Sequence, residues 1–165
     1  MALLHIYDSS DSFIRETAWR RAVPDHIAAD NPIALVAALD DLVKAGSTFD
    51  RVLFETHGAP GLIAFGTVPI DAGWLLAAIS NNYTQIVTAN AKVLFNGCNV
   101  AEGAEGWKFL YAAAKLFLTP GGGQVIGQTS VGWGNPISGH VIHFWGDTRS
   151  LLVDFSGRVV ERFES

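Results

Sequence analysis

Two short apolar runs constrain the fold of this 165-residue chain more than any other feature of its sequence. Residues 51–56 (Arg-Val-Leu-Phe-Glu-Thr) and 92–96 (Lys-Val-Leu-Phe-Asn) carry apolar side chains at consecutive positions instead of alternating them with polar ones. This pattern is typical of central parallel strands, because helices cover such strands on both faces of the sheet. The two runs therefore predict an α/β fold built on a mostly parallel sheet.

Three helices are predicted between and after these strands. Asn31 and Pro32 supply a side-chain cap and a proline at the first helical position, and apolar residues then recur at helical spacing up to Gly46. The same spacing predicts a second helix after Asp71 and a third from about residue 102 to residue 118. Helices and strands thus alternate through the first three quarters of the chain.

The remaining segments predict further strands and one long loop. Residues 9–30 are polar and irregular, so we expect a loop there, and residues 59–66 carry turn residues around a short apolar stretch, which indicates a small hairpin or an ordered loop. Because strands follow one another without helices at the end of the chain, we expect an antiparallel β-meander there. The other predicted strands are residues 3–8, 124–128, 140–145, 150–155 and 159–163.

Size and composition indicate one self-folding domain over residues 1–165, since apolar residues make up 49% and charged residues 16% of the chain. The net charge of −5 and the absence of a Lys/Arg cluster argue against a nucleic acid partner. No stretch approaches the roughly 20 apolar residues of a membrane-spanning helix, and the first residues do not form a basic, apolar leader. We therefore expect a cytoplasmic protein with no membrane partner; its oligomeric state is left open.

Two reactive residues stand directly after the two apolar runs. His57 follows the first run, and Cys98 follows the second after one intervening glycine. Ligands of open parallel sheets bind beyond the carboxyl ends of the strands, so both side chains are expected at one rim. The adjacent glycines, Gly58 and Gly97, would let the backbone turn sharply and approach a ligand closely.

These two residue types suit nucleophilic catalysis. The thiolate is the reactive form of cysteine, and a free thiol with the ordinary pKa of about 8.5 is only slightly ionised at neutral pH. A neighbouring imidazole accepts the proton and returns it to the leaving group. We therefore predict a His57–Cys98 dyad, with the amides of Gly58 and Cys98 as donors to the oxyanion. No third residue that would orient His57 is evident in the sequence.

The segments that contain this pair resemble a known family. Phe54–Gly61 (Phe-Glu-Thr-His-Gly-Ala-Pro-Gly) and Val93–Asn99 (Val-Leu-Phe-Asn-Gly-Cys-Asn) resemble the two signatures of caspase-like (clan CD) peptidases. With Cys98–Gly103, Gly106 and Phe109, the stretch resembles in particular a bacterial caspase-like domain of large surface and adhesin proteins. The resemblance covers roughly residues 50–131. It implies a caspase-like three-layer sandwich: a mostly parallel central sheet, helices on both faces and a C-terminal antiparallel meander.

The resemblance also implies a cysteine endopeptidase that cleaves a protein or peptide substrate through a thioester, without a cofactor. It implies that a backbone carbonyl is enough to hold the imidazole ring. It places Asn96, two residues before the cysteine, in the pocket for the substrate side chain on the amino side of the cut. Caspases proper carry Gln-Ala-Cys-Arg-Gly where this chain has Asn-Gly-Cys-Asn-Val, so their preference for aspartate does not carry over.

The remaining walls of that pocket are expected from two loops, one after the first strand and one around Trp133. In the first loop, Asp8 and Asp11 outnumber Arg15, which favours a basic or polar substrate side chain over an acidic one. Two alternatives to a peptidase stay open. The chain could be a catalytically silent interaction module that has kept the fold, or a His-Cys hydrolase of a non-peptide acyl substrate.

Other candidate features predict structural roles. A lone cysteine after an apolar strand is often a small buried hydrophobic residue, which is the structural, non-catalytic alternative for Cys98. His140 and His143 would point to opposite faces of one strand, so no metal site is expected, and His5 and His26 have no partners in sequence. The glycine-rich segment 120–123 precedes a strand instead of joining a strand to a helix, which argues against a nucleotide-binding loop.

Overall fold

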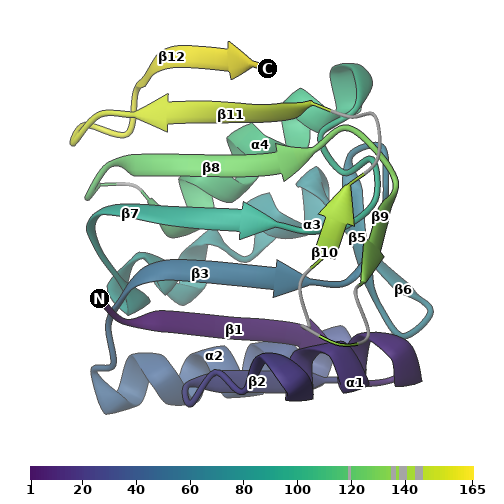
Figure 1. Ribbon diagram of the computed structural model, residues 1–165. Helices are drawn as coiled ribbons and strands as arrows, with labels where there is room; N and C mark the ends of the chain where they lie inside the picture. The colour runs from purple at the N-terminus through teal and green to yellow at the C-terminus, as the bar shows by residue number, and fades with distance from the viewer. Residues whose placement is uncertain (119, 135–136, 138–140, 144–146) are drawn as a thin grey trace.

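The computed structural model describes residues 1–118, 120–134, 137, 141–143 and 147–165, with residues 133, 134 and 141–143 described by their backbone alone. A seven-stranded sheet forms its centre, in the order β12-β11-β8-β7-β3-β1-β2 (Figure 1). The strands of this sheet are β1 (Leu3–Asp8), β2 (His26–Ala29), β3 (Phe49–Glu55), β7 (Val87–Phe95), β8 (Gly123–Gln128), β11 (Thr148–Val153) and β12 (Val159–Glu164).

The sheet is mixed and mostly parallel. Strands β2, β1, β3, β7 and β8 pair in parallel, while β11 pairs antiparallel with β8 and β12 antiparallel with β11. The predicted α/β class, with a parallel core and an antiparallel C-terminal extension, is confirmed. Since β3 and β7 are neighbours in register, their carboxyl ends lie side by side, and the chain continues from these two ends to His57 and Cys98 respectively.

Helices lie on both faces of the sheet. One face is covered by α2 (Pro32–Ala45), α3 (Ala72–Ala77) and α4 (Gly103–Phe117), together with the short 3-10 helices η1 (Ile79–Asn81) and η2 (Tyr83–Ile86). The other face carries α1 (Ser12–Arg21), which lies near β1 and β2 in Figure 1. Within the described part of the chain, the second face therefore has a single helix that covers only one end of the sheet.

The predicted ends of α2 are confirmed in detail. Asn31 caps the helix by accepting the N–H of Ala34, Pro32 occupies the first turn, and Gly46 ends it with a left-handed backbone at φ +66°. Asp71 caps α3 in the same way, by accepting the N–H of Trp74. These helices form where their caps predicted them.

The expected loop at residues 9–30 is wrong, because α1 and β2 lie within it. Helix α1 buries only Thr17 and Ala18, so it lacks the apolar stripe on which a prediction from periodicity depends. Asp11 starts this helix by accepting the N–H groups of Phe13 and Ile14. Strand β2 has only four residues at the sheet edge, too few for a pattern to stand out.

The C-terminal meander differs in part from the expectation, whereas the predicted hairpin is present. The C-terminal meander has β11 and β12 in the main sheet, but β10 (Val141–His143) pairs instead with β9 (Gly132–Gly134) in a separate two-stranded sheet. The expected hairpin at residues 59–66 is confirmed, because β4 (His57–Ala59) pairs antiparallel with β5 (Leu62–Phe65), and β6 (Val68–Asp71) extends it to a three-stranded sheet. No helix among the described residues has the length and apolar character needed to cross a membrane.

An aromatic cluster supports the strand ends from below. Phe95, the last residue of β7, is fully buried and stacks on Phe54 of β3 with ring centroids 4.7 Å apart. Its edge meets Phe109 of α4 at 5.0 Å. Because Phe54 and Phe95 are also paired across the two strands, this cluster fixes β3, β7 and α4 relative to one another directly beneath the candidate site.

Phe95→Ala should therefore lower the free energy of unfolding by about 3–5 kcal/mol, as expected for truncation of a buried phenylalanine. Phe155→Ala serves as the control, because Phe155 is 65% exposed, and it should change stability by no more than about 0.5 kcal/mol. Chemical denaturation of both variants checks this, and equal losses would show that the cluster does not hold the strand ends.

Candidate active site

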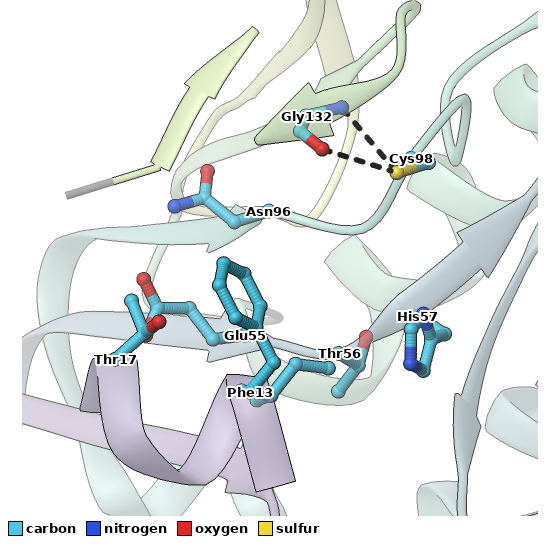
Figure 2. A pocket seen from close by; sticks show the side chains of 9 residues that line it. Phe13, Thr17, Glu55, Thr56, His57, Asn96, Cys98 and Gly132 are labelled. Carbon is cyan, nitrogen blue, oxygen red and sulfur yellow. Dashed lines mark hydrogen bonds between the residues drawn. The ribbon is translucent and has the colours of Figure 1, made fainter. Parts of the chain in front are cut away.

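A single pocket brings together the residues that the sequence placed at the strand ends. It opens beyond the carboxyl ends of β3 and β7, between α1 and β9, and encloses about 490 Å³ of space, open solvent at its mouth included. Three predicted site residues, His57, Asn96 and Cys98, contribute to its wall (Figure 2). The full lining is Phe13, Ile14, Thr17, Glu55, Thr56, His57, Asn96, Cys98 and Gly132.

Gly58 and Gly97 allow the two turns that contain His57 and Cys98 to contact each other through their backbones. A Cβ atom added to Gly58 would lie 2.8 Å from the carbonyl oxygen of Cys98, and one added to Gly97 would lie 3.2 Å from the Cα of Gly58. Neither glycine has a positive φ, so close packing is what demands glycine here. The glycines thus allow the two turns to approach each other closely; approach to a ligand stays a prediction.

The turn after the cysteine is attached to the end of β8. Asn99 has a left-handed backbone at φ +55°, which asparagine tolerates better than most residues, and its N–H donates to the carbonyl of Ser130 at 3.0 Å. Two residues later, the N–H of Ala101 donates to the carbonyl of Gln128 at 2.9 Å. These bonds hold the backbone on the carboxyl side of Cys98 against the neighbouring strand.

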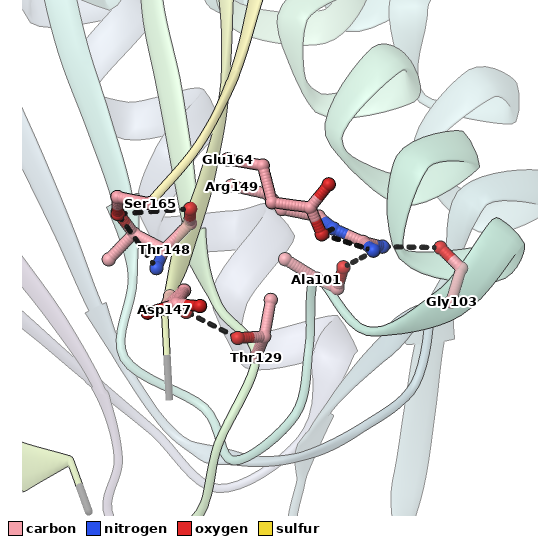
Figure 3. A network of polar contacts seen from close by, with 8 residues as sticks. All are labelled: Ala101, Gly103, Thr129, Asp147, Thr148, Arg149, Glu164 and Ser165. Atoms are coloured by element: carbon pink, nitrogen blue, oxygen red, sulfur yellow. Dashed lines mark hydrogen bonds and ion pairs between the residues drawn. The ribbon is translucent and has the colours of Figure 1, made fainter. Parts of the chain in front are cut away.

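Arg149 of β11 supports the same turn from the far side (Figure 3). Its guanidinium donates to the carbonyl oxygens of Ala101 at 3.0 Å and Gly103 at 2.8 Å. Glu164 of β12 pairs with the same guanidinium through an Nε–Oε1 bond of 2.7 Å, and the group lies 5.0 Å from the ring centroid of Trp107. The antiparallel extension thus reaches into the turn that carries the cysteine.

The sulfur of Cys98 faces the backbone of β9. It accepts the N–H of Gly132 at 3.3 Å and makes a longer contact of 3.9 Å with the carbonyl oxygen of the same residue (Figure 2). Cys98 is half-buried and reachable from the pocket, so the alternative of a fully buried hydrophobic cysteine does not describe it. No hydrogen bond joins Cys98 to His57 in the described part of the chain; such bonds often form only when substrate is present.

Asp11 is the partner of His57 that sequence reasoning missed. The imidazole Nε2 lies 3.0 Å from Oδ2 of Asp11, while Oδ1 of the same carboxylate caps α1 through the N–H groups of Phe13 and Ile14. The N–H of Ile14, and after it the hydrogen bond to His57, lower the pKa of Asp11 below its ordinary value of 3.8. A carboxylate therefore holds one ring nitrogen and leaves Nδ1 to face elsewhere.

Asp8 lies outside the pocket, although it was predicted to bind substrate. Its side chain is fully buried, and its two oxygens accept the N–H groups of Ser10 at 3.0 Å and Gly66 at 3.2 Å. Asp8 therefore fastens the loop after β1 to the turn between β5 and β6. Arg15 is likewise occupied, since it donates to the carbonyl oxygen of Ser9.

Other sequence candidates have the following positions. Trp133 follows the pocket residue Gly132 in β9, but its side chain lies outside the described residues, as does that of His143. His140 lies wholly outside them. His5 is buried beside Glu55, and His26 is exposed on the edge strand. Among the described residues, no group of three or more His, Cys, Asp and Glu side chains could hold a metal ion.

Comparison with known protein families matches part of the chain to a family model. The model of a family described as a domain of unknown function (DUF4347) matches residues 25–119, which is more than half of the chain. The matched segment contains His57, Glu55 and Cys98, whereas Asp11 precedes it and Arg149 follows it. No curated protein matches the chain.

The partnership of Asp11 and His57 can be separated from the helix cap by two substitutions. Asp11→Asn keeps a good cap but removes the charge beside the imidazole, so alkylation of Cys98 by iodoacetamide at neutral pH should slow by at most about fivefold, the limit for an exposed pair. Asp11→Ala should slow alkylation similarly and also lower the free energy of unfolding by about 1 kcal/mol. Unchanged alkylation in both variants would contradict a role for Asp11 at His57.

The same carboxylate gives a stability difference that depends on pH. Because folding lowers the pKa of Asp11, its charge stabilises the protein above the ordinary pKa of 3.8, and this contribution disappears as the pH falls through the lowered folded value. The wild type should therefore be more stable than Asp11→Asn near neutrality, and the difference should close in acid. Denaturation at several pH values measures it; a gap that widens toward low pH would contradict this assignment.

Arg149→Ala tests whether the antiparallel extension positions the cysteine. Loss of both carbonyl contacts should lower the free energy of unfolding by about 1–3 kcal/mol and slow alkylation of Cys98 under conditions where the variant remains folded. Methylguanidinium at a concentration that does not denature should restore part of the rate. Arg158→Ala is the control, because Arg158 is 78% exposed, and it should leave the rate unchanged. An Arg149→Ala variant that reacts at the wild-type rate would contradict positioning.

Proposed function

The chain belongs to the DUF4347 family, and we propose that it is a cysteine endopeptidase in which His57 and Cys98 form the catalytic pair. The observation that carries this proposal is the backbone contact of Gly58 with Gly97, which holds a histidine and a cysteine from neighbouring strands at the mouth of one pocket. We further propose that the fold is a caspase-like three-layer sandwich, with α1 as the described part of the second helical layer.

The first chemical step uses the two residues of the pair. His57 accepts the thiol proton of Cys98, and the sulfur attacks the carbonyl carbon of the scissile peptide bond. Because Asp11 is bonded to Nε2, Nδ1 is the nitrogen that takes the proton. The carboxylate of Asp11 then stabilises the imidazolium that forms. The amides of Gly58 and Cys98 are the proposed donors to the oxyanion, because both belong to the turns that meet at the pocket mouth.

The second half of the reaction returns the enzyme to its starting state. The tetrahedral intermediate collapses, the C–N bond breaks, and His57 gives its proton to the leaving amine, so that a thioester remains on Cys98. Water then adds to the thioester while His57 removes its proton, the C–S bond breaks as the acid product forms, and His57 returns the proton to the departing thiolate of Cys98. His57 and Cys98 carry out every proton transfer in these reaction steps.

Two alternatives are weighed against this proposal. A silent interaction module would not need a half-buried, reachable cysteine beside a histidine that is itself held by a carboxylate. A hydrolase of another acyl group would use the same pair, but the pocket beside the pair has apolar walls and polar side chains at its far end, which suits an amino-acid side chain. The first feature favours catalysis over a silent module, and the second favours a peptide over another acyl substrate.

A cleavage profile of a whole proteome tests the proposal. Peptides newly formed by the wild type should share a sequence preference around the cut, and Cys98→Ala should form none of them. The substitution removes one sulfur from a half-buried site, so the variant should fold and unfold cooperatively like the wild type. Peptide formation by folded Cys98→Ala, or none by the wild type, would refute the proposed function.

A further inference from the structure

The far end of the pocket holds a buried carboxylate. Glu55, the last residue of β3, is 3% exposed, and its side chain runs along the pocket past Phe13 and away from Cys98 and His57 (Figure 2). His5 bonds to one oxygen at 2.7 Å and Arg21 of α1 bonds to the other at 2.5 Å. Both partners keep the carboxylate in one position, as a recognition group requires.

This carboxylate retains capacity to accept further hydrogen bonds. Each carboxylate oxygen has two lone pairs, and each oxygen of Glu55 has one bonded partner among the described residues. Neither of those partners, His5 nor Arg21, belongs to the pocket wall. A donor that entered the pocket would therefore meet the carboxylate oxygens without displacing either partner.

Other acceptors surround the same space. The hydroxyl of Thr56, a residue that is 6% exposed, has no hydrogen-bond partner in the described part of the chain. Asn96 also lines the pocket, and Thr17 is drawn next to the Glu55 carboxylate (Figure 2). An unpartnered buried hydroxyl is costly, so Thr56 marks a place where a ligand group would be stabilised.

The charges of the wall select among ligands. No lysine or arginine belongs to the described lining, and His57 stands at the mouth with Asp11 as its partner. An acidic group would meet the carboxylate of Glu55, while Arg21, the cation at that carboxylate, is already bonded to it and does not belong to the lining. An apolar group would cover Glu55 and Thr56 without bonding to either, and buried polar groups left in that state are destabilising.

We infer that the pocket receives a long basic side chain of the substrate, lysine or arginine, on the amino side of the cut, and that Glu55 is the acceptor that determines this specificity. The inference rests on the proposed peptidase function. Phe13 and Ile14 cover the methylene groups of the bound side chain, and its charged end reaches the Glu55 carboxylate at the far end of the pocket. Glu55 thus takes the place of the carboxylates of Asp8 and Asp11, which the structure finds engaged elsewhere.

Matched peptide substrates test the inference without altering the protein. The residue before the cut is varied as lysine against norleucine, arginine against citrulline, and glutamate. Within each pair, chain length is nearly conserved and the charge is removed. The wild type should cleave each basic peptide with a kcat/KM at least about tenfold above that of its neutral partner. It should cleave the glutamate peptide more slowly than the neutral peptides.

Two variants assign the preference to the pocket. Glu55→Gln should lower the lysine-to-norleucine ratio about tenfold with little change for norleucine, whereas Glu161→Gln, the same change on exposed β12, should leave the ratio unchanged. Because the substitution removes the charge that pairs with Arg21, folding of the variant must be measured by denaturation. If Glu55→Gln fails to fold, Asn96→Asp gives the converse test: it adds a carboxylate to the pocket and should raise the ratio.

The outcomes distinguish this inference from the function on which it rests. Failure of the wild type to cleave any peptide would refute the peptidase proposal itself. Cleavage that requires Cys98 but prefers norleucine, citrulline or glutamate would overturn the pocket inference alone. A lysine-to-norleucine ratio unaffected by folded Glu55→Gln, or by Asn96→Asp where Glu55→Gln does not fold, would overturn it in the same way.

Discussion

The contact between the backbones of Gly58 and Gly97 is the constraint on which the candidate site depends. Neighbouring strands in a sheet lie about 4.8 Å apart, so turns that leave adjacent strands in register have little room between them. Here those turns also carry the two reactive residues, and a Cβ on Gly58 would strike backbone atoms that cannot swing aside as a side chain could. The same packing that unites His57 and Cys98 thus requires glycine at Gly58 and leaves little room for a side chain at Gly97.

The pair is supported from two directions by parts of the chain that are distant in sequence. Asp11, at the start of α1, holds the imidazole from one side. Arg149, in the antiparallel extension, holds the turn of Cys98 from the other, and Gly132 contacts the sulfur. All three lie outside residues 25–119, the segment that defines the family match. The reactive pair therefore belongs to the matched segment, whereas its positioning depends on the flanking elements.

The sequence predicted those features that local patterns determine. Continuous apolar runs identified β3 and β7, caps and spacing identified α2, and the residues after each strand identified His57 and Cys98. Helix α1 was missed because a helix that buries only Thr17 and Ala18 gives no clear periodicity. Because this helix was not predicted, the role of Asp11 was missed as well, although its position before Ser-Phe-Ile was the available sign of a helix cap.

Two carboxylates show why the pocket was harder to predict. In β1, Leu4, Ile6 and Asp8 share the face that packs on the main core, so strand alternation would have placed Asp8 away from a pocket on the opposite face. Glu55 was visible as a charged residue in an apolar strand two positions before His57. Its partners, His5 and Arg21, come from distant segments, and only the folded chain brings them together.

The most direct test of this account is the detection of an acyl group on Cys98. An activated ester of an Nα-acylated lysine is mixed with the protein, and intact and peptide mass spectrometry follow the adduct over time. The account predicts a transient mass increase equal to the acyl group, located on Cys98, released by hydroxylamine, and formed much more slowly in His57→Ala. Absence of an adduct, its location on another residue, or an equal rate in His57→Ala would contradict it.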